Sequence, residues 1–248
     1  MLNILSIGNS FSQDAQTYLH RVARAEKESI FCVNLYIGGC GLEQHFRNIM
    51  GDKREYEIQV CGMSSGFYTS VKEALLSRKW DVITIQQASH FSMDFSTYVP
   101  YLEEIAAFIR RYAPTARLYI HETWGYESGS DRIRRYGFET MREMSEQVFE
   151  AYQKAYALIG ADGMIPSGHA MLALAEAGQA LVHRDPFHAS FGAGRYLLAC
   201  VWYETLAGKP VANEGFSDFD TEVSEETLSR VREIAHRTIL EFSQSEGK

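Results

Sequence analysis

The sequence predicts an α/β domain with a five-stranded parallel sheet and helices on both of its faces. Five short apolar runs are typical of parallel strands that are buried on both sides. Helical apolar patterns lie between these runs, and the alternation indicates right-handed βαβ units in a doubly wound sheet. The five runs are Leu2–Ile7, Ile30–Ile37, Val82–Ile85, Leu118–Ile120 and Gly163–Ile165.

The segments between the runs carry stripes of apolar residues at the spacing of one helix face. One stripe begins just after Pro100. Proline is well tolerated there, because the first N–H groups of a helix have no intrahelical partner. The expected helices cover residues 15–23, 102–109, 141–155, 190–206 and about 224–242.

Residues 54–70 interrupt the alternation of strands and helices. They hold aromatic and β-branched residues around Gly62 and Gly66, a composition that predicts a β-hairpin excursion before the next helix. Neither an internal repeat nor a low-complexity linker divides the chain. We therefore expect residues 1–248 to form one domain.

The composition narrows the class of protein further. The chain has 248 residues, is 46% hydrophobic and carries 24 Lys and Arg against 32 Asp and Glu, a net charge of −8. These proportions are those of a globular domain, and the acidic balance argues against a nucleic-acid partner. The first residues resemble neither a signal peptide nor a membrane span, and the four cysteines match no zinc or redox pattern. We expect a cytoplasmic protein with reduced thiols and no membrane partner.

Chemistry is expected beyond the carboxyl ends of the strands, where open parallel sheets bind their ligands. The first strand runs into Gly8-Asn9-Ser10-Phe11-Ser12. A serine in such a turn sits at a helix N-terminus, where it can attack a carbonyl while its own N–H binds the oxyanion. The alternative is that Ser10 or Ser12 only caps the helix.

The next strand ends offer further polar groups. The glycines of Gly38-Gly39-Cys40-Gly41 let backbone N–H groups approach a ligand, or simply make a sharp turn. Gln86 and Gln87 leave a buried strand, so their amides need partners. They serve either as oxyanion donors or as ties to a neighbouring loop. Trp124 and Tyr126 form either a stacking wall for a sugar or acyl group, or core packing.

Asp185 and His188 lie three residues apart across a turn that Pro186 stiffens. A carboxylate that accepts from one imidazole nitrogen leaves the other nitrogen free to act as a base. In the alternative, Asp185 and Ser190 are turn and helix caps and His188 is an ordinary surface residue. A metal site from His183, Asp185 and His188 is disfavoured, because iron triads draw their second histidine from far along the chain.

Together these motifs resemble the SGNH (GDSL-type) hydrolase superfamily, and within it an uncharacterised bacterial branch. The phrases Ile7-Gly8-Asn9-Ser10-Phe11-Ser12, Gly38-Gly39-Cys40-Gly41-Leu42-Glu43-Gln44-His45 and Asp185-Pro186-Phe187-His188 carry the resemblance. It runs from residue 3 to about residue 208 and leaves the final helix outside. It implies a three-layer α/β/α, flavodoxin-like fold. It also implies an enzyme that hydrolyses carboxylic esters without a metal or organic cofactor.

The resemblance also implies roles for individual residues. Ser10 becomes the nucleophile, His188 the general base and Asp185 the residue that orients it, while the N–H groups of Ser10 and Gly39 bind the oxyanion. Asn9 stands where the superfamily usually has Asp. The third block, usually Gly-x-Asn-Asp, reads Gln86-Gln87-Ala88-Ser89. The third oxyanion donor is therefore a glutamine or is absent, and the sequence does not separate Gln86 from Gln87.

The expected function is removal of small acyl groups, acetyl above all, from a carbohydrate-like substrate, with Trp124 as a compatible substrate contact. The alternative is a non-catalytic, flavodoxin-like module that binds phosphate or a nucleotide at the same strand ends. The sequence sets neither the acyl length, the leaving group nor the oligomeric state. It also assigns no role to His90, His121 or His169.

Overall fold

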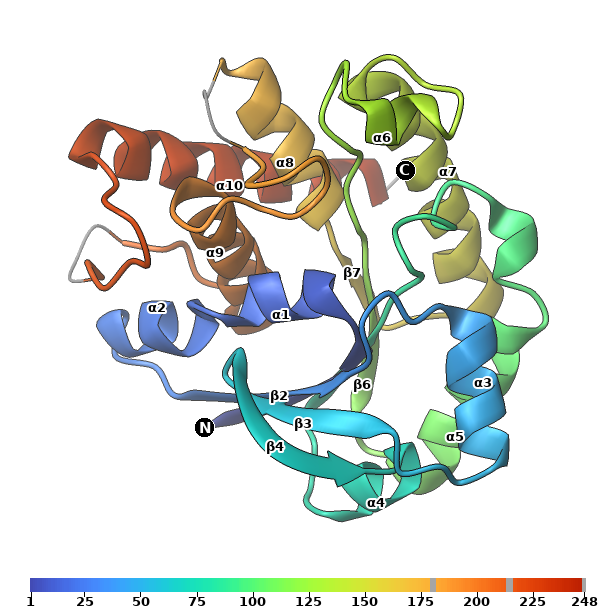
Figure 1. Cartoon of the computed structure of the whole chain (residues 1–248). Helices are drawn as coiled ribbons and strands as arrows, with labels where there is room; N and C mark the ends of the chain where they lie inside the picture. Colours follow the sequence, from blue (N-terminus) through green and yellow to red (C-terminus); the bar gives the residue numbers. More distant parts are fainter. Residues whose placement is uncertain (179–181, 213–215, 247–248) are drawn as a thin grey trace.

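The sheet has seven strands rather than five. The computed structural model describes residues 1–178, 182–212 and 216–246, and its strand order is β4-β3-β2-β1-β5-β6-β7 (Figure 1). The five predicted runs form its parallel part. The strands are β1 Leu2–Gly8, β2 Ile30–Tyr36, β3 Tyr56–Val60, β4 Met63–Thr69, β5 Val82–Ile85, β6 Arg117–His121 and β7 Gly163–Ile165.

The predicted hairpin is present, but it belongs to the main sheet instead of standing apart from it. Strand β3 pairs antiparallel with β2 in a register that runs from Val33↔Val60 to Tyr36↔Glu57, and β4 pairs with β3. The prediction of a five-stranded, all-parallel sheet is therefore wrong. Local patterns reveal a hairpin, whereas the open edge of β2, with its unpaired N–H and C=O groups, decides where the hairpin docks.

Helices cover both faces of the sheet. Helices α1, α2 and α9 contact one another on one face, and α3, α5 and α7 form a second group on the other (Figure 1). The predicted stripe at residues 15–23 is divided between two helices. The helices are α1 Ser10–Gln16, α2 Leu19–Ala25, α3 Leu42–Met50, α4 Val71–Leu76, α5 Tyr101–Tyr112, α6 Asp131–Arg134, α7 Met141–Ile159, α8 Ser167–Glu176, α9 Ala193–Ala207 and α10 Glu225–Glu246, with a short 3-10 turn, η1, at Phe95–Thr97.

Local sequence explains where the long helix α7 starts and stops. Thr140 and Glu143 form a reciprocal capping box at its start, which satisfies N–H groups that lack an intrahelical acceptor. Gly160 ends it in the left-handed conformation, with φ 52°, which costs glycine little. Between these signals one apolar stripe is buried against the protein.

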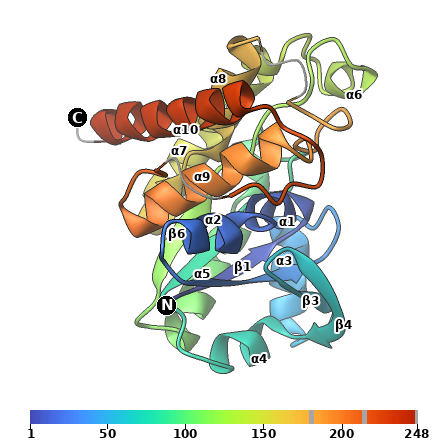
Figure 2. The ribbon, with the colours of Figure 1, turned by 90° about the vertical axis from the view of Figure 1, so that its left-hand side faces the viewer.

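Helix α9 is apolar on nearly all sides, as expected of a helix that is buried all round. It lies between α1 and α2 on one side and α10 on the other, and α10 crosses the outside of α8 and α9 (Figure 2). In the described parts of the chain, no helix is long and apolar enough to span a bilayer. The four cysteines are free thiols, and three of them are buried: Cys32, Cys40 and Cys200.

Candidate active site

Asn9, not a serine, caps the first helix. Its Oδ1 accepts the backbone N–H of Phe11 at 3.0 Å, which is the usual contact of a helix cap. Ser10 is therefore the first helical residue, and its hydroxyl is not needed for capping. The alternative in which Ser10 or Ser12 is only the cap is wrong.

The two serines of this motif have different surroundings. Ser12 is buried, and its Oγ donates to Oε1 of Gln86 at 2.5 Å. A Cβ added at Gly8 would lie 2.3 Å from this Oγ, so the close approach of Ser12 requires glycine there. Ser10 instead lines a cavity about 400 Å³ in volume. Only Ser10 is thus placed to meet a ligand.

Asp185 shapes the loop that carries His188 and also holds its ring. Oδ1 of Asp185 accepts the N–H groups of Phe187 and His188 at 3.0 and 2.9 Å. Its Oδ2 lies 2.7 Å from Nδ1 of His188. The two oxygens therefore do separate things: one closes the turn, and the other fixes the imidazole. The turn-cap interpretation and the ring-orienting interpretation are both compatible with this geometry.

The other nitrogen of the same ring faces the start of α1. Nε2 of His188 lies 2.8 Å from Oγ of Ser10. With Nδ1–H directed at the carboxylate of Asp185, Nε2 is the acceptor for the serine hydroxyl. Segments from opposite ends of the chain thus bring a hydroxyl, an imidazole and a carboxylate into one hydrogen-bonded row.

The charge state of Asp185 suits this row. Partial burial opposes its ionisation, but hydrogen bonds from His188 and Phe187 outweigh burial and lower the pKa of the carboxyl below its ordinary value. The carboxylate is therefore ionised at neutral pH and can stabilise a positive charge on the imidazole.

A buried ion cluster joins the serine helix to the histidine loop. Asp14, one turn after Ser10, is fully buried, and both of its oxygens accept from Nη1 of Arg184, at 2.9 and 2.8 Å. Nε of Arg195 on α9 donates to the same carboxylate at 2.9 Å. Removing one partner of such a cluster leaves an uncompensated buried charge. Asp14 therefore holds α1, the loop and α9 in fixed relation.

The side chains of the two glutamines that follow β5 bond to neighbouring residues of the protein. Nε2 of Gln86 donates to Asn9 Oδ1 at 2.9 Å, and its Oε1 accepts from Ser12 and lies 2.7 Å from Nδ1 of His121. Nε2 of Gln87 donates to Thr97. Both amides are occupied by internal contacts, and neither side chain is among those that line the cavity. This placement does not support a glutamine as oxyanion donor.

Ser89 is the member of the third block that reaches the cavity. Of its four residues, all of which the structure describes, Ser89 alone lines the space around Ser10. Its Oγ lies 3.0 Å from the hydroxyl of Tyr126. The sequence motifs had pointed to the glutamines of this block and not to Ser89.

Trp124 is a core residue and not a wall of the cavity. It is fully buried, its ring stacks on Phe11 with centroids 4.1 Å apart, and its Nε1 donates to the carbonyl of Phe187 at 2.8 Å. Trp124 thus packs against and stabilises the loop that carries His188. Tyr126 is also fully buried, so the expectation of an aromatic substrate wall at these two residues is not supported.

The structure also places the remaining histidines. His90 lines the cavity, and burial together with the nearby Arg132 lowers its pKa. His121 lies in the network beneath Gln86, and His169 pairs with Glu122 at 2.9 Å. Nε2 of His183 faces the carbonyl of Gly125 at 3.2 Å. Within the described ranges, no three His, Cys, Asp or Glu side chains converge as metal ligands.

The sequence motifs did not indicate two features of this site, the buried Asp14 and the cavity-lining Arg132. Asp14 follows Ser10 by one helical turn, and Arg184 directly precedes Asp185. Their positions next to the two motifs could have indicated that they pair. Arg132, which lines the cavity, comes from the short helix α6. No local pattern distinguishes it from the arginines beside it.

Buried neutral histidines predict a loss of stability in acid. Burial lowers the pKa of His45 and His121 to about 3 and that of His183 to about 4. The unfolded chain takes up protons on these rings below about pH 6.5, whereas the folded chain does not. Between pH 7 and pH 5 we expect the free energy of unfolding to fall by about 2 kcal/mol for each ring.

Urea unfolding at the two pH values measures this change. A His121→Leu variant should be less stable at pH 7, because Gln86 loses a partner. Its free energy of unfolding should fall less between pH 7 and pH 5, by the contribution of one histidine ring. Equal pH dependence in the variant and the original chain would contradict the assignment.

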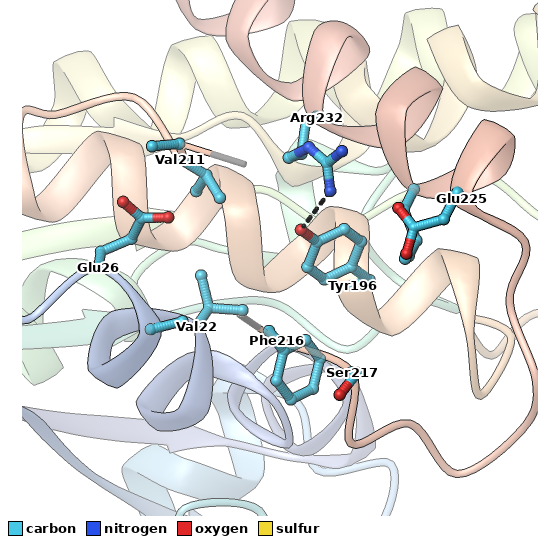
Figure 3. A pocket seen from close by; sticks show the side chains of 11 residues that line it. Val22, Glu26, Tyr196, Val211, Phe216, Ser217, Glu225 and Arg232 are labelled. Atoms are coloured by element: carbon cyan, nitrogen blue, oxygen red, sulfur yellow. Dashed lines mark hydrogen bonds between the residues drawn. The ribbon is translucent and has the colours of Figure 1, made fainter. Parts of the chain in front are cut away.

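A separate cavity of about 250 Å³ lies between α2, α9 and α10 (Figure 3). Arg232 donates to the hydroxyl of Tyr196 there at 3.3 Å. The described residues that line it include neither histidine nor cysteine. Its carboxylates, Glu26 and Glu225, form no serine–histidine pair, so the cavity at Ser10 remains the candidate active site.

Comparisons with known proteins extend these findings. The family model described as domain of unknown function DUF4886 matches residues 3–238, so it reaches into α10, which the sequence analysis had left outside. A crystal structure of a DUF4886 family protein from Bacteroides uniformis ATCC 8492 has a TM-score of 0.86 at 32% identity, covering 96% of this chain and 95% of that one. No curated protein matches the chain.

More distant structures share the fold. A proposed SGNH hydrolase from Slackia heliotrinireducens has a TM-score of 0.60 at 24% identity, with 83% of this chain and 98% of that one covered. The psychrotrophic esterase EstA from Pseudoalteromonas sp., in a structure inhibited by monoethylphosphonate, has a TM-score of 0.55 at 14% identity, with 84% and 98% covered. The resemblance to the SGNH and GDSL hydrolases is confirmed at the level of the fold.

Proposed function

The chain belongs to the DUF4886 family, and from its candidate site we propose that it is a serine esterase that acts through an acyl-enzyme. A fold alone does not imply an activity, so the proposal depends on the site. The observation that carries it is the row of 2.7 and 2.8 Å contacts from Asp185 through His188 to Ser10. This is the geometry by which a base activates a serine hydroxyl.

In the proposed first step, Nε2 of His188 takes the hydroxyl proton as Ser10 Oγ attacks the ester carbonyl. Asp185 stabilises the imidazolium that forms. The imidazolium then returns the proton to the leaving alcohol, and the acyl group stays on Ser10. In the second step water attacks this acyl-enzyme with His188 again as base, which frees the acid and restores the serine.

The oxyanion is assigned to donors that line the same cavity. The N–H of Ser10 lies in the first helical turn, where N–H groups have no intrahelical acceptor. Gly39 lines the cavity with φ 64°, a conformation that glycine adopts at little cost. We assign the third donor to the hydroxyl of Ser89, which is free to donate when Tyr126 donates to it. Removing one such donor is expected to lower kcat by about 10²- to 10³-fold.

The substrate class that this site favours is a small ester, such as an acetylated carbohydrate. The cavity of about 400 Å³ lies near the lower end of the range for small-molecule sites. Its lining mixes aromatic rings with polar groups. These residues are Asn9, Ser10, Phe11, Gln13, Tyr36, Gly38, Gly39, Ser89, His90, Arg132, Arg184, Phe187 and His188.

Turnover of p-nitrophenyl acetate tests the proposed function. We expect the rate of p-nitrophenol release to saturate with substrate concentration, either with an initial burst or at a constant rate. An added metal ion should not change this rate. Calorimetric titration with inorganic phosphate, in the same buffer, is the matched control. Tight phosphate binding without hydrolysis of any ester would identify a non-catalytic binding module and overturn the proposal.

A further inference from the structure

One cation in the cavity has no carboxylate to neutralise it. Arg132 on α6 lines the space around Ser10, and its Nε is buried without a hydrogen-bond partner in the described chain. Among residues 1–178, 182–212 and 216–246, no Asp or Glu lies within ion-pair distance of it. The second arginine in the cavity, Arg184, is by contrast paired with the buried Asp14.

The rest of the cavity lining supplies no carboxylate to offset this positive charge. Its described lining contains neither Asp nor Glu, although the chain as a whole carries a net charge of −8. The remaining titratable groups of the lining are Tyr36, His90 and His188. Arg132 is half-buried and its guanidinium lies over the rings of Phe187 and Tyr126, but its Nε remains unpaired, and a planar anion that accepts two of its N–H groups would satisfy that Nε.

Arg132 lies near the proposed base, His188, with the ring of Phe187 between them. Its Cζ is 4.7 Å from the ring centre of Phe187, and that ring is 4.0 Å from the ring of His188. In acyl transfer the leaving oxygen sits beside the base, because the base must return the proton to it. Of the groups assigned to the oxyanion, Gly39 comes from a different strand end, whereas the hydroxyl of Ser89 lies 3.0 Å from that of Tyr126, whose ring centre is 5.5 Å from Cζ of Arg132.

We propose that Arg132 is a specificity-determining residue that binds an anionic group, a carboxylate or a phosphate, on the alcohol part of the ester. This inference rests on the proposed esterase activity and names the substrate class of the same site. The contact is charge-assisted, so it strengthens binding of anionic esters and leaves neutral esters unaffected. It also weakens as ionic strength rises.

Matched acetate esters test the inference. The first pair is (4-acetoxyphenyl)acetate and (4-acetoxyphenyl)acetamide, whose leaving phenols are similar in acidity and differ in charge. A third ester, 4-acetoxyphenyl phosphate, tests whether phosphate serves as well as carboxylate. Phenyl hemisuccinate against phenyl pentanoate places the charge on the acyl side instead. The enzymes compared are the original chain, Arg132→Met, Arg132→Lys and, as control, Arg135→Met, an exposed arginine beside α6.

The original chain should prefer the anionic acetate over the amide by roughly 10- to 100-fold in kcat/KM. Arg132→Met should abolish this preference while its activity on the amide stays within about threefold, Arg132→Lys should keep part of it, and Arg135→Met should keep all of it. Added salt should reduce the preference in the original chain.

Four results would overturn the inference. An equal rate on the anionic and neutral acetates, or a preference that survives Arg132→Met, leaves the esterase proposal intact but removes Arg132 as its selector. A preference only in the hemisuccinate pair places the anion on the acyl side and contradicts the assigned position. Failure of every ester with the original chain removes the esterase proposal, and this inference with it.

Discussion

Ser10→Ala is expected to lower kcat/KM for p-nitrophenyl acetate by roughly 10⁴- to 10⁶-fold, because the acyl-enzyme can no longer form. The hydroxyl lies 2.8 Å from Nε2 of His188 and does not cap the helix, so its loss should leave the fold unchanged. Steady-state kinetics and labelling with a fluorophosphonate probe measure the effect. The probe should modify Ser10 in the original chain and nothing in the variant.

Ser12→Ala is the matched control, since it removes the other serine of the same motif. It breaks the buried contact with Gln86 and should lower stability by about 1 kcal/mol. Fluorophosphonate labelling should survive it. A probe that reacts with a serine other than Ser10, or that still labels Ser10→Ala, would refute the assignment of the nucleophile.

His188→Ala is expected to reduce kcat by a comparable factor, roughly 10⁴-fold or more. The variant retains the hydroxyl but has no base to take its proton. Removal of the ring also leaves space, so imidazole added to the buffer should restore part of the activity in a concentration-dependent manner. The same concentration of imidazole should not rescue Ser10→Ala.

Asp185→Asn provides a graded comparison. An amide cannot accept from Nδ1–H in the same way and can favour the wrong tautomer, which costs about 10⁴-fold where the acid is fully buried. The Asp185 side chain is 38% exposed, so water screens its charge and we expect a smaller loss, roughly 10²- to 10³-fold. Undiminished activity in both variants would show that this histidine and carboxylate are not catalytic.

The resemblance to the SGNH hydrolases predicted the meeting of Ser10, Asp185 and His188. Ser10 follows β1 at the carboxyl edge of the sheet, where open parallel sheets bind their ligands, whereas Asp185 and His188 lie on the loop between α8 and α9. Local turn chemistry supplied the rest, because Asp185 and His188 are held by their own short loop. The order of the strands in the sheet was harder to predict from the sequence. The hairpin of β3 and β4 joined the sheet at β2 through long-range pairing that no local pattern encodes.

Gln86 shows why side-chain roles are harder to predict than positions. An amide that leaves a buried strand needs partners, and an oxyanion was one of the partners expected for it. In the folded chain Asn9, Ser12 and His121 satisfy that amide instead. Ser89, three residues later, reaches the cavity.

Periodicity and turn residues were enough to place the five core strands, the main helices and the serine and histidine motifs, because backbone geometry links these features to residues close together in the sequence. The pairing of Asp14 with two arginines and the position of Arg132 in the cavity, over the rings of Phe187 and Tyr126, became evident only in the folded chain. A buried polar group bonds to whatever packing brings within about 3 Å, and those neighbours come from segments far apart along the chain.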